Sequence, residues 1–372
     1  MEEKAQGPRL RSFGEGPEAH IVMGNLYLRQ KEYPKAIEEF QAALSDNPDS
    51  SMAHFGLGNV YLRQNQNDLA AEAYATTLKF NPELAAARFC LGVIHLREQR
   101  TDEAVREFEE ALRLDPQLAM VHLALGNVHL SQNQYVEAIH QFQATLRLKP
   151  TSMFAFFRLA KAYISVGEPG EAIKVYQEAA RLNPQAALPR LQLAALHAEA
   201  QRYPEAIDLL RAALEIQPKM PWVHAQLGDV LAASGDEAGA TAEYAEAMRL
   251  KPGRAVLHLK MGNLHLDHGR PQEAIIAYQE ALRHNPRLAE THRRLGNAQA
   301  AVGREAEAMA QYRAALRLNP RMAAAMVDLG DLYEGQGRSD LAQAEYRRAL
   351  ETEPDFQPAK QRLAAGGGEA EA

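Results

Sequence analysis

A pattern of 34 residues recurs ten times in this chain, from Pro17 to Phe356, without an inserted or deleted residue. Every copy has a small residue at position 8, an alanine at position 20 and a proline at position 32. The position 8 residues are Gly24, Gly58, Gly92, Gly126, Ala160, Ala194, Gly228, Gly262, Gly296 and Gly330. A fixed period of this length indicates a stacked array, in which each unit buries its apolar face against its neighbours.

Each copy has the pattern of two helices. In the fourth copy, residues 119–132 and residues 136–148 both place apolar side chains at helical spacing. Asn133 and Gln134 provide the turn between them, and Pro150 ends the second segment because the residue before a proline is disfavoured in the α region. The predicted unit is therefore a pair of antiparallel helices of about 14 residues each.

The recurring small residues predict closely packed helices. Glycine inside a helix costs about 1 kcal/mol, so its recurrence at position 8 needs a packing reason. With no bulky side chain at position 8 or position 20, the two helices can approach each other tightly. Aromatic rings at position 24 are then expected to fill the gap to the next repeat, and Leu210 is the only departure. These rings are Phe40, Tyr74, Phe108, Phe142, Tyr176, Tyr244, Tyr278, Tyr312 and Tyr346.

This pattern resembles the tetratricopeptide repeat family over 340 of the 372 residues. The resemblance implies an all-α fold, a right-handed α-solenoid superhelix of ten helix-turn-helix repeats. First helices would line a concave groove, and ten repeats would pass one full superhelical turn. The repeats are residues 17–50, 51–84, 85–118, 119–152, 153–186, 187–220, 221–254, 255–288, 289–322 and 323–356.

The chain ends differ from the repeats. Residues 1–16 are rich in glycine, proline and charge, which predicts a flexible arm. Residues 357–365 are polar enough to form a capping helix over the last repeat. Gly366, Gly367 and Gly368 are expected to end that helix, so residues 366–372 are predicted to be a flexible tail.

Composition argues against several classes of function. The net charge of −7 and the pI of about 6.0 argue against a nucleic-acid partner. No apolar run approaches the roughly 20 residues that span a bilayer, and the N-terminus lacks the apolar core of a signal peptide. Cys90 is the single cysteine, which excludes an intrachain disulfide and fits a reducing compartment. These features predict a cytoplasmic protein.

The residues suggest no catalytic site. The sequence has no phosphate-binding glycine loop, nucleophile elbow or zinc-binding helix motif. Histidines recur at positions 4 and 11, where aromatic residues usually pack between helices in the family. We therefore interpret them as packing residues, and metal binding is the alternative. No enzyme activity, metal or cofactor is predicted.

Apolar residues at positions 2 and 5 predict the binding surface, because ligand contacts in the family come mainly from positions 2, 5, 9, 12 and 13. An exposed apolar surface of this extent usually marks a binding site. The alternative is that these side chains pack against the neighbouring first helix. The candidates are Met120, Leu123, Phe154, Phe157, Leu188, Leu191, Trp222 and Leu259.

Asparagines at position 9 are the second part of the predicted site. An amide can bond both the N–H and the C=O of an extended peptide, so Asn127 and Asn263 are expected to hold partner backbone. Solvated side chains without a ligand are the alternative. The family's carboxylate clamp for chaperone C-termini is not matched, and the nearest set, Arg293 and Asn297, is followed by the wrongly charged Asp328.

The leading hypothesis is a non-enzymatic scaffold or adaptor. Its groove would bind a helix or an extended segment of another protein. The alternatives are self-association, a non-catalytic subunit of an enzyme or assembly complex, and a carrier of an apolar ligand. Because fold does not imply function, the partner and the pathway do not follow from the residues.

Overall fold

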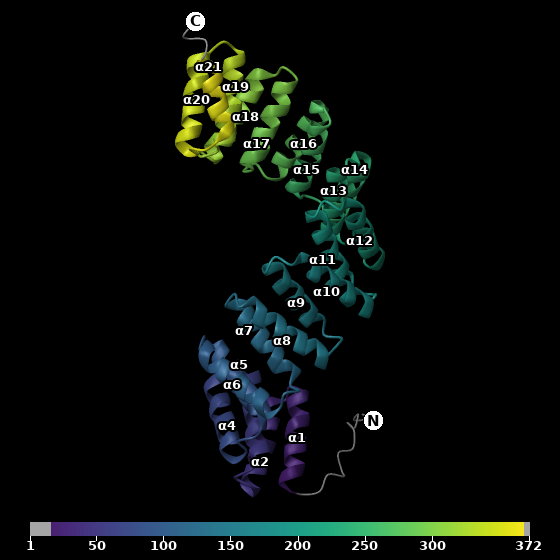
Figure 1. Ribbon diagram of the computed structural model, residues 1–372, viewed down its shortest axis with the longest axis vertical. Coiled ribbons are helices and arrows are strands. Elements are labelled where there is room, and N and C mark those ends of the chain that lie inside the picture. The colour runs from purple at the N-terminus through teal and green to yellow at the C-terminus, as the bar shows by residue number, and fades with distance from the viewer. Residues whose placement is uncertain (1–15, 368–372) are drawn as a thin grey trace, which may run out of the picture. The chain divides into compact units, whose positions relative to one another are not determined.

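The computed structural model describes residues 16–367, and every regular element in this range is an α-helix (Figure 1). Each 34-residue repeat contains a first helix and a second helix. The predicted all-α repeat solenoid is therefore confirmed. The chain divides into two compact units, which meet between Leu182 and Asn183 and which we describe separately.

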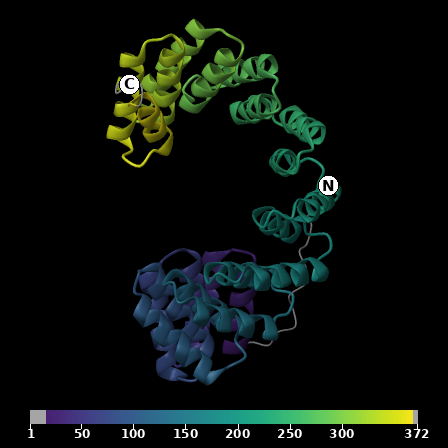
Figure 2. The ribbon, with the colours of Figure 1, turned by 45° about the horizontal axis from the view of Figure 1, so that its top comes forward.

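The first unit holds repeats 1 to 5. Its helices pack side by side in antiparallel pairs (Figure 2). The first helices are α1 (Pro17–Arg29), α3 (Ser51–Arg63), α5 (Ala85–Arg97), α7 (Ala119–Ser131) and α9 (Met153–Ser165). The second helices are α2 (Tyr33–Asp46), α4 (Asn67–Phe80), α6 (Thr101–Leu114), α8 (Tyr135–Leu148) and α10 (Pro169–Leu182).

The second unit holds repeats 6 to 10 and one further helix, α21 (Gln357–Gly367). The first helices are α11 (Ala187–Glu199), α13 (Pro221–Ser234), α15 (Ala255–Asp267), α17 (Ala289–Ala301) and α19 (Ala323–Gly335). The second helices are α12 (Tyr203–Ile216), α14 (Glu237–Leu250), α16 (Pro271–His284), α18 (Glu305–Leu318) and α20 (Ser339–Thr352).

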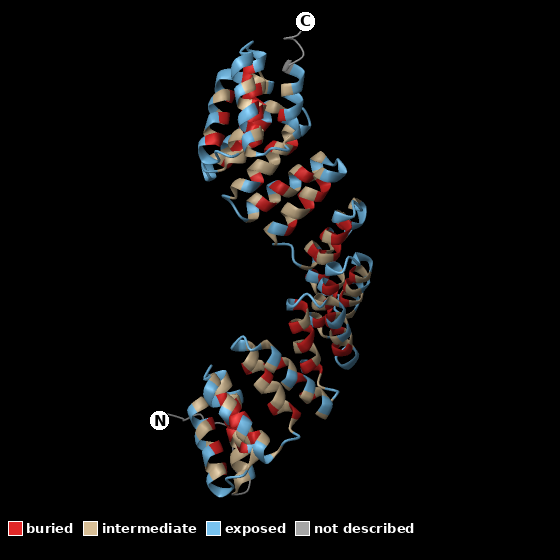
Figure 3. Ribbon diagram, turned by 60° about the vertical axis from the view of Figure 1, so that its left-hand side comes forward, coloured by how far each residue is buried: buried red, intermediate tan, exposed pale blue. Residues whose placement is uncertain are grey.

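The core of each repeat is built around its small residues. The alanine at position 20 is fully buried in all ten repeats. The position 24 ring lies directly over the position 8 glycine of its own repeat: a Cβ on Gly126 would be 2.6 Å from Phe142. We expected these rings to fill the gap to the next repeat, and the ring of Phe40 does both, since it covers Gly24 and also Gly56 of the second repeat. Figure 3 shows the buried residues along the facing sides of the helices.

The sixth repeat reaches the same packing with different residues. Ala194 replaces the glycine, and Leu210 replaces the ring. Both side chains are buried in one cluster with Leu191 and Leu227. In this repeat a larger residue on the first helix accompanies a smaller one on the second helix, whereas the fifth repeat buries Ala160 together with the ring of Tyr176.

The turn between the two helices has the same backbone geometry in every repeat. The residue at position 15 adopts a positive φ, between 57° and 88°, which closes the first helix in the left-handed region. Glycine occupies this place in repeats 5 and 7 to 10, and residues with side chains occupy it in the others. The latter are Lys31, Asn65, Gln99, Asn133 and Gln201.

Helix α21 packs on the last repeat. Ala359 is fully buried, and Phe356 and Leu363 contact the same cluster as Tyr346. The helix continues through Gly367, two residues beyond the predicted end. Apart from Gly16, Gly366 and Gly367, the predicted N-terminal arm and C-terminal tail lie outside the described residues.

Candidate functional site

First helices of neighbouring repeats contact each other in both units. In the first unit α1 contacts α3 and α7 contacts α9, and in the second unit α15 contacts α17. Side chains at position 2 project from this row of helices into solvent. Met120 is 55% exposed and Phe154 is 49% exposed, and they lie on the adjacent helices α7 and α9. We call these two side chains, with the pocket described below, the α7–α9 surface.

Position 5 differs from position 2, because its side chains are partly taken up by the core. Leu123 packs on a cluster that contains Phe142 and Leu159. The Phe157 ring lies 5.4 Å from the ring of Tyr176, centroid to centroid. Both residues are half-buried, so only part of each is available to a partner.

The second unit repeats this division. Leu188 is 50% exposed and Trp222 is 47% exposed, both at position 2. Leu259 is half-buried against Tyr278 and Leu295. These exposed side chains extend the apolar character of position 2 into repeats 6 and 7.

Leu191 corrects the predicted set of contacts. It is only 4% exposed and packs among Leu210, Val223 and Leu227. Leu191 is therefore a core residue and no longer a candidate anchor. A charge introduced there would break the core and would not report on binding.

Position 9 is largely engaged inside the protein. The hydroxyl of Tyr278 donates to Asn263 Oδ1 at 2.8 Å, and that of Tyr74 donates to Asn59 Oδ1 at 2.9 Å. In the seventh repeat Tyr244 donates to Asp229, and burial followed by this carboxylate raises the pKa of the hydroxyl, which keeps it a donor. The oxygen of Asn263 thus already has a partner, contrary to the expectation of an amide free at both ends.

Asn127 is different. Its second-helix neighbour is Phe142, which has no hydroxyl, and Asn127 Oδ1 is buried without a hydrogen-bond partner. A buried acceptor without a partner costs about 1–3 kcal/mol. Of the two predicted backbone-holding asparagines, Asn127 is therefore the one with an unused acceptor.

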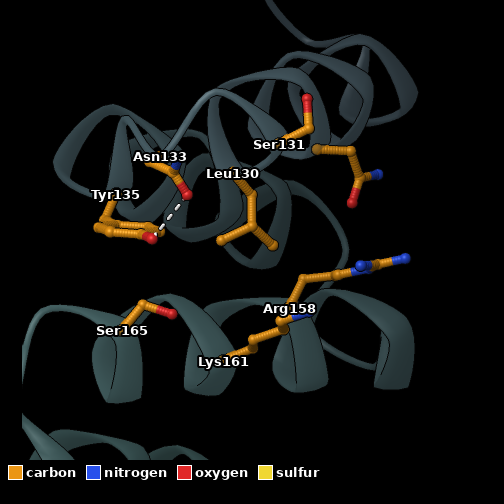
Figure 4. A pocket seen from close by; sticks show the side chains of 8 residues that line it. Leu130, Ser131, Asn133, Tyr135, Arg158, Lys161 and Ser165 are labelled. Atoms are coloured by element: carbon orange, nitrogen blue, oxygen red, sulfur yellow. Dashed lines mark hydrogen bonds between the residues drawn. The ribbon is translucent and has the colours of Figure 1, made fainter.

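A pocket of about 430 Å³ adjoins Asn127, between α7 with its following turn and α9 (Figure 4). Arg158, Lys161 and Ser165 of α9 line one side. The opposite side has Asn127, Leu130, Ser131, Asn133 and Tyr135. None of the lining residues is acidic, so the pocket is cationic.

Histidines at position 4 are held by hydrogen bonds to the scaffold. His122 Nδ1 lies 2.7 Å from Gln141 Oε1, and His122 Nε2 lies 3.2 Å from the carbonyl oxygen of Pro116. His224 and His292 repeat this arrangement in the second unit. The ring therefore joins the two helices of its repeat to the proline-marked turn before it, which is a packing role.

Comparison with known proteins decides the family. A family model described as tetratricopeptide repeat matches residues 21–85, 57–119, 91–153, 157–221, 259–323 and 294–359, which is most of the chain. The chain belongs to the tetratricopeptide repeat family. A second model of the same description matches residues 197–264. Tetratricopeptide repeats are generally protein-interaction modules without catalysis of their own.

Solved structures support the same fold. The C-terminal part of a tetratricopeptide repeat-containing protein from Cytophaga hutchinsonii is 15% identical, with a TM-score of 0.53 over 64% of this chain and 98% of that chain. A tetratricopeptide repeat protein from Parabacteroides merdae is 15% identical, with a TM-score of 0.51 over 66% of this chain and 97% of that chain. Among curated proteins none matches. In residues 16–367 no helix has the length and apolar character to cross a membrane.

Arg293, in the residue set most similar to the family's carboxylate clamp, is neutralised by carboxylates of the chain itself. Arg293 Nη1 donates to Asp328 Oδ2 at 2.8 Å, and its other end pairs with Glu290. Burial raises the pKa of Asp328, while the hydrogen bond from Arg293 opposes that shift. Arg293 is thus committed to carboxylates of the chain itself.

Arg158 and Lys161 are the site residues that the sequence analysis missed. Lys161 departs from asparagine at position 9, and Arg158 lies at position 6, outside the five positions that make most ligand contacts in the family. A comparison of position 6 with position 9 of the preceding repeat could have found Arg158, together with Arg294, which follows the neutral Asn263 but pairs with Glu290. Asp229 is followed by Lys260, and Asp331 by Arg362, so these two pairs carry opposite charges. Arg158 follows the neutral Asn127.

Proposed function

We propose that the chain is a non-enzymatic scaffold whose first helices bind a helix or an extended segment of a partner protein. The observation that supports this is the row of exposed apolar side chains at position 2. Met52, Met120 and Phe154 supply it in the first unit, and Leu188, Trp222 and Val256 in the second. Large apolar and aromatic side chains of this kind are typical interface anchors.

The side chains at position 2 are better suited to binding a partner than to stabilising the fold. A side chain that is half exposed gains little from folding, and a polar residue there would cost the fold little. The fixed register of the array presents one such side chain in repeat 2 and in each of repeats 4 to 8, which suits the regularly spaced apolar side chains of an amphipathic segment. Asn127 would add a hydrogen bond to partner backbone.

A paired binding measurement tests the proposal. A partner is first identified by capture from native lysate and purified, and its affinity is then measured by calorimetry. The variant Met120→Ser with Phe154→Ser should weaken binding at least tenfold. The matched control is Val136→Ser with Ile276→Ser, which removes two equally exposed apolar side chains from second helices and should leave affinity unchanged.

Each contrary outcome identifies a different function. Equal affinity of both variants would refute binding at position 2. Concentration-dependent dimers in light scattering that vanish in the Met120→Ser, Phe154→Ser variant would assign the surface to a second copy of the chain. An apolar molecule retained in native mass spectrometry would assign it to a carrier.

A further inference from the structure

Ten copies of one unit allow each repeat to be compared with the others at the same place. In repeats 2, 7, 8 and 10 the oxygen at position 9 accepts a hydrogen bond from the tyrosine at position 24. In repeats 3 and 6 both positions are apolar. Repeats 1 and 4 break this pairing, because each keeps the asparagine but has phenylalanine in place of tyrosine, and in repeat 4 Asn127 Oδ1 is left buried without a donor.

A second pairing links consecutive repeats and is also broken at this place. Lys260 at position 6 donates to Asp229 at position 9 of the preceding repeat, at 2.6 Å. Arg362 of α21 makes the equivalent bidentate contact with Asp331, at 2.6 and 2.9 Å. Arg158 also occupies position 6, but position 9 of the preceding repeat is the neutral Asn127.

The two cationic side chains of the pocket, Arg158 and Lys161, are therefore not paired with any carboxylate of the described residues. Neither Arg158 nor Lys161 forms an ion pair there, whereas five of the eleven arginines on the second helices pair with a glutamate three residues away. The guanidinium of Arg158 instead lies 4.8 Å from the ring centre of Phe154, an exposed anchor of the α7–α9 surface. The cationic pocket is thus continuous with the apolar part of that surface.

We propose that this pocket binds a carboxylate side chain of an acidic partner segment. The proposal rests on the function proposed above and specifies the chemistry of the partner. A glutamate or aspartate would accept hydrogen bonds from Arg158 and Lys161, and so take the place that Asp229 and Asp331 fill elsewhere in the chain. Rotation of the Asn127 side chain would turn its Oδ1, which has no donor in the core, toward a backbone N–H of the same segment. An apolar side chain of the segment would pack on Phe154.

Charge and volume both favour this occupant. Charge-assisted hydrogen bonds from arginine to carboxylate are about twice as strong as neutral ones. The lining adds the hydroxyl groups of Ser131 and Ser165 and no competing acid. A volume of about 430 Å³ is within the usual range of ligand pockets and accommodates an acidic side chain with its flanking backbone.

An array of peptides tests the inference with the full-length protein. The probes are randomised twelve-residue peptides of equal leucine content that carry zero, two or four glutamates. Binding to wild type should rise with the number of glutamates. The affinity of the best peptide, measured by fluorescence anisotropy, should fall at least tenfold when sodium chloride is raised from 50 to 300 mM, since the contact is electrostatic.

Charge-removing variants locate the site. Arg158→Gln with Lys161→Gln should abolish the dependence on glutamate and weaken the best peptide at least tenfold. Neither residue takes part in an ion pair, so the variant should keep the wild-type helical content. The matched control, Arg147→Gln with Lys149→Gln, removes two exposed charges from the end of α8 and should leave the dependence intact.

A third variant separates binding from stability. Phe142→Tyr places a hydroxyl where Tyr278 has one, and this hydroxyl would occupy Asn127 Oδ1. The variant should unfold at the same or higher temperature than wild type and yet bind the best peptide several-fold more weakly. A merely structural role of Asn127 would not move these two readouts in opposite directions.

The failures are distinguishable. Peptides that bind wild type through leucine alone, regardless of glutamate, overturn the acidic specificity and leave the scaffold proposal standing. A dependence on glutamate that survives in the Arg158→Gln, Lys161→Gln variant places the contact elsewhere and overturns the site. Absence of binding by every class of peptide overturns both proposals.

Discussion

Replacing Gly92 with alanine tests whether the position 8 glycines are required by the ring beside them. A Cβ at Gly92 would lie 2.5 Å from Phe108, whereas ordinary contact begins at 3.4 Å, so the ring would have to retreat by about 0.9 Å. Phe108 is fully buried among Ala104, Val121 and Leu125, so its ring could move only if these neighbours moved as well. Overpacking of this kind costs about 1–3 kcal/mol. The gain of about 1 kcal/mol in helix propensity offsets part of it.

We therefore expect Gly92→Ala to destabilise the third repeat by at most about 2 kcal/mol. The cost is limited because the fifth repeat buries Ala160 and Tyr176 at the same two positions. The sixth repeat suggests the compensating change, since Ala194 and Leu210 pack together there. Phe108→Leu alone should also destabilise, because it leaves a cavity. The double variant should be more stable than the sum of the two single effects by at least about 1 kcal/mol, as expected for residues in contact.

Hydrogen exchange read by mass spectrometry is the appropriate assay, because long arrays depart from two-state unfolding and exchange resolves each helix pair. Protection of α5 and α6 should fall in each single variant and recover in part in the double variant. The control is Gly335→Ala, where a Cβ meets nothing within 4 Å and a gain of protection is expected. Additive effects of the two changes, or a gain of protection in Gly92→Ala, would refute the reasoning.

Three further predictions concern stability. The Thr291 hydroxyl is buried without a partner, so Thr291→Val should stabilise by about 1 kcal/mol in thermal unfolding, whereas Thr77→Val, which loses a hydrogen bond to a backbone carbonyl, should not. Gln99 has φ 61°, so Gln99→Gly should raise protection of the α5–α6 turn, and Gly303→Ala, at φ 76°, should lower protection of the α17–α18 turn by a comparable factor. Ala359→Asp would bury a charge and should therefore raise the hydrogen-exchange rate of α21 at least tenfold. An unchanged exchange rate in α21 would contradict this prediction.

The fold followed from the sequence because the closest contacts fall on residues with few alternatives. Glycine at position 8, alanine at position 20 and proline at position 32 each restrict what can lie beside them. Their exact period places all ten helix pairs. The end of α21 was misplaced because its three glycines were expected to stop the helix at residue 365, and its backbone remains helical through Gly367.

The candidate surface was less predictable, since exposure at one position depends on a partner in another helix. Leu188 and Leu191 look alike in the sequence, but Leu188 is 50% exposed and Leu191 packs in a core cluster with Leu210 and Leu227. The state of Asn127 likewise depends on the absence of a hydroxyl fifteen residues later, at Phe142. Such side-chain pairs can be recognised only when the packing of the helices against each other is known.

The identical length of all ten repeats has an evolutionary consequence. Unequal recombination between two repeats would add or remove whole helix pairs and would rejoin the chain in register, because every repeat ends at an equivalent residue. Helix α21 restricts the repeats after which such an array can end. Arg362 contacts an acid at position 9 of the repeat before it, and only Asp229 and Asp331 provide one. Descendants shortened to end after the seventh repeat would keep this closure, whereas those that end after the third or the sixth would need a new one.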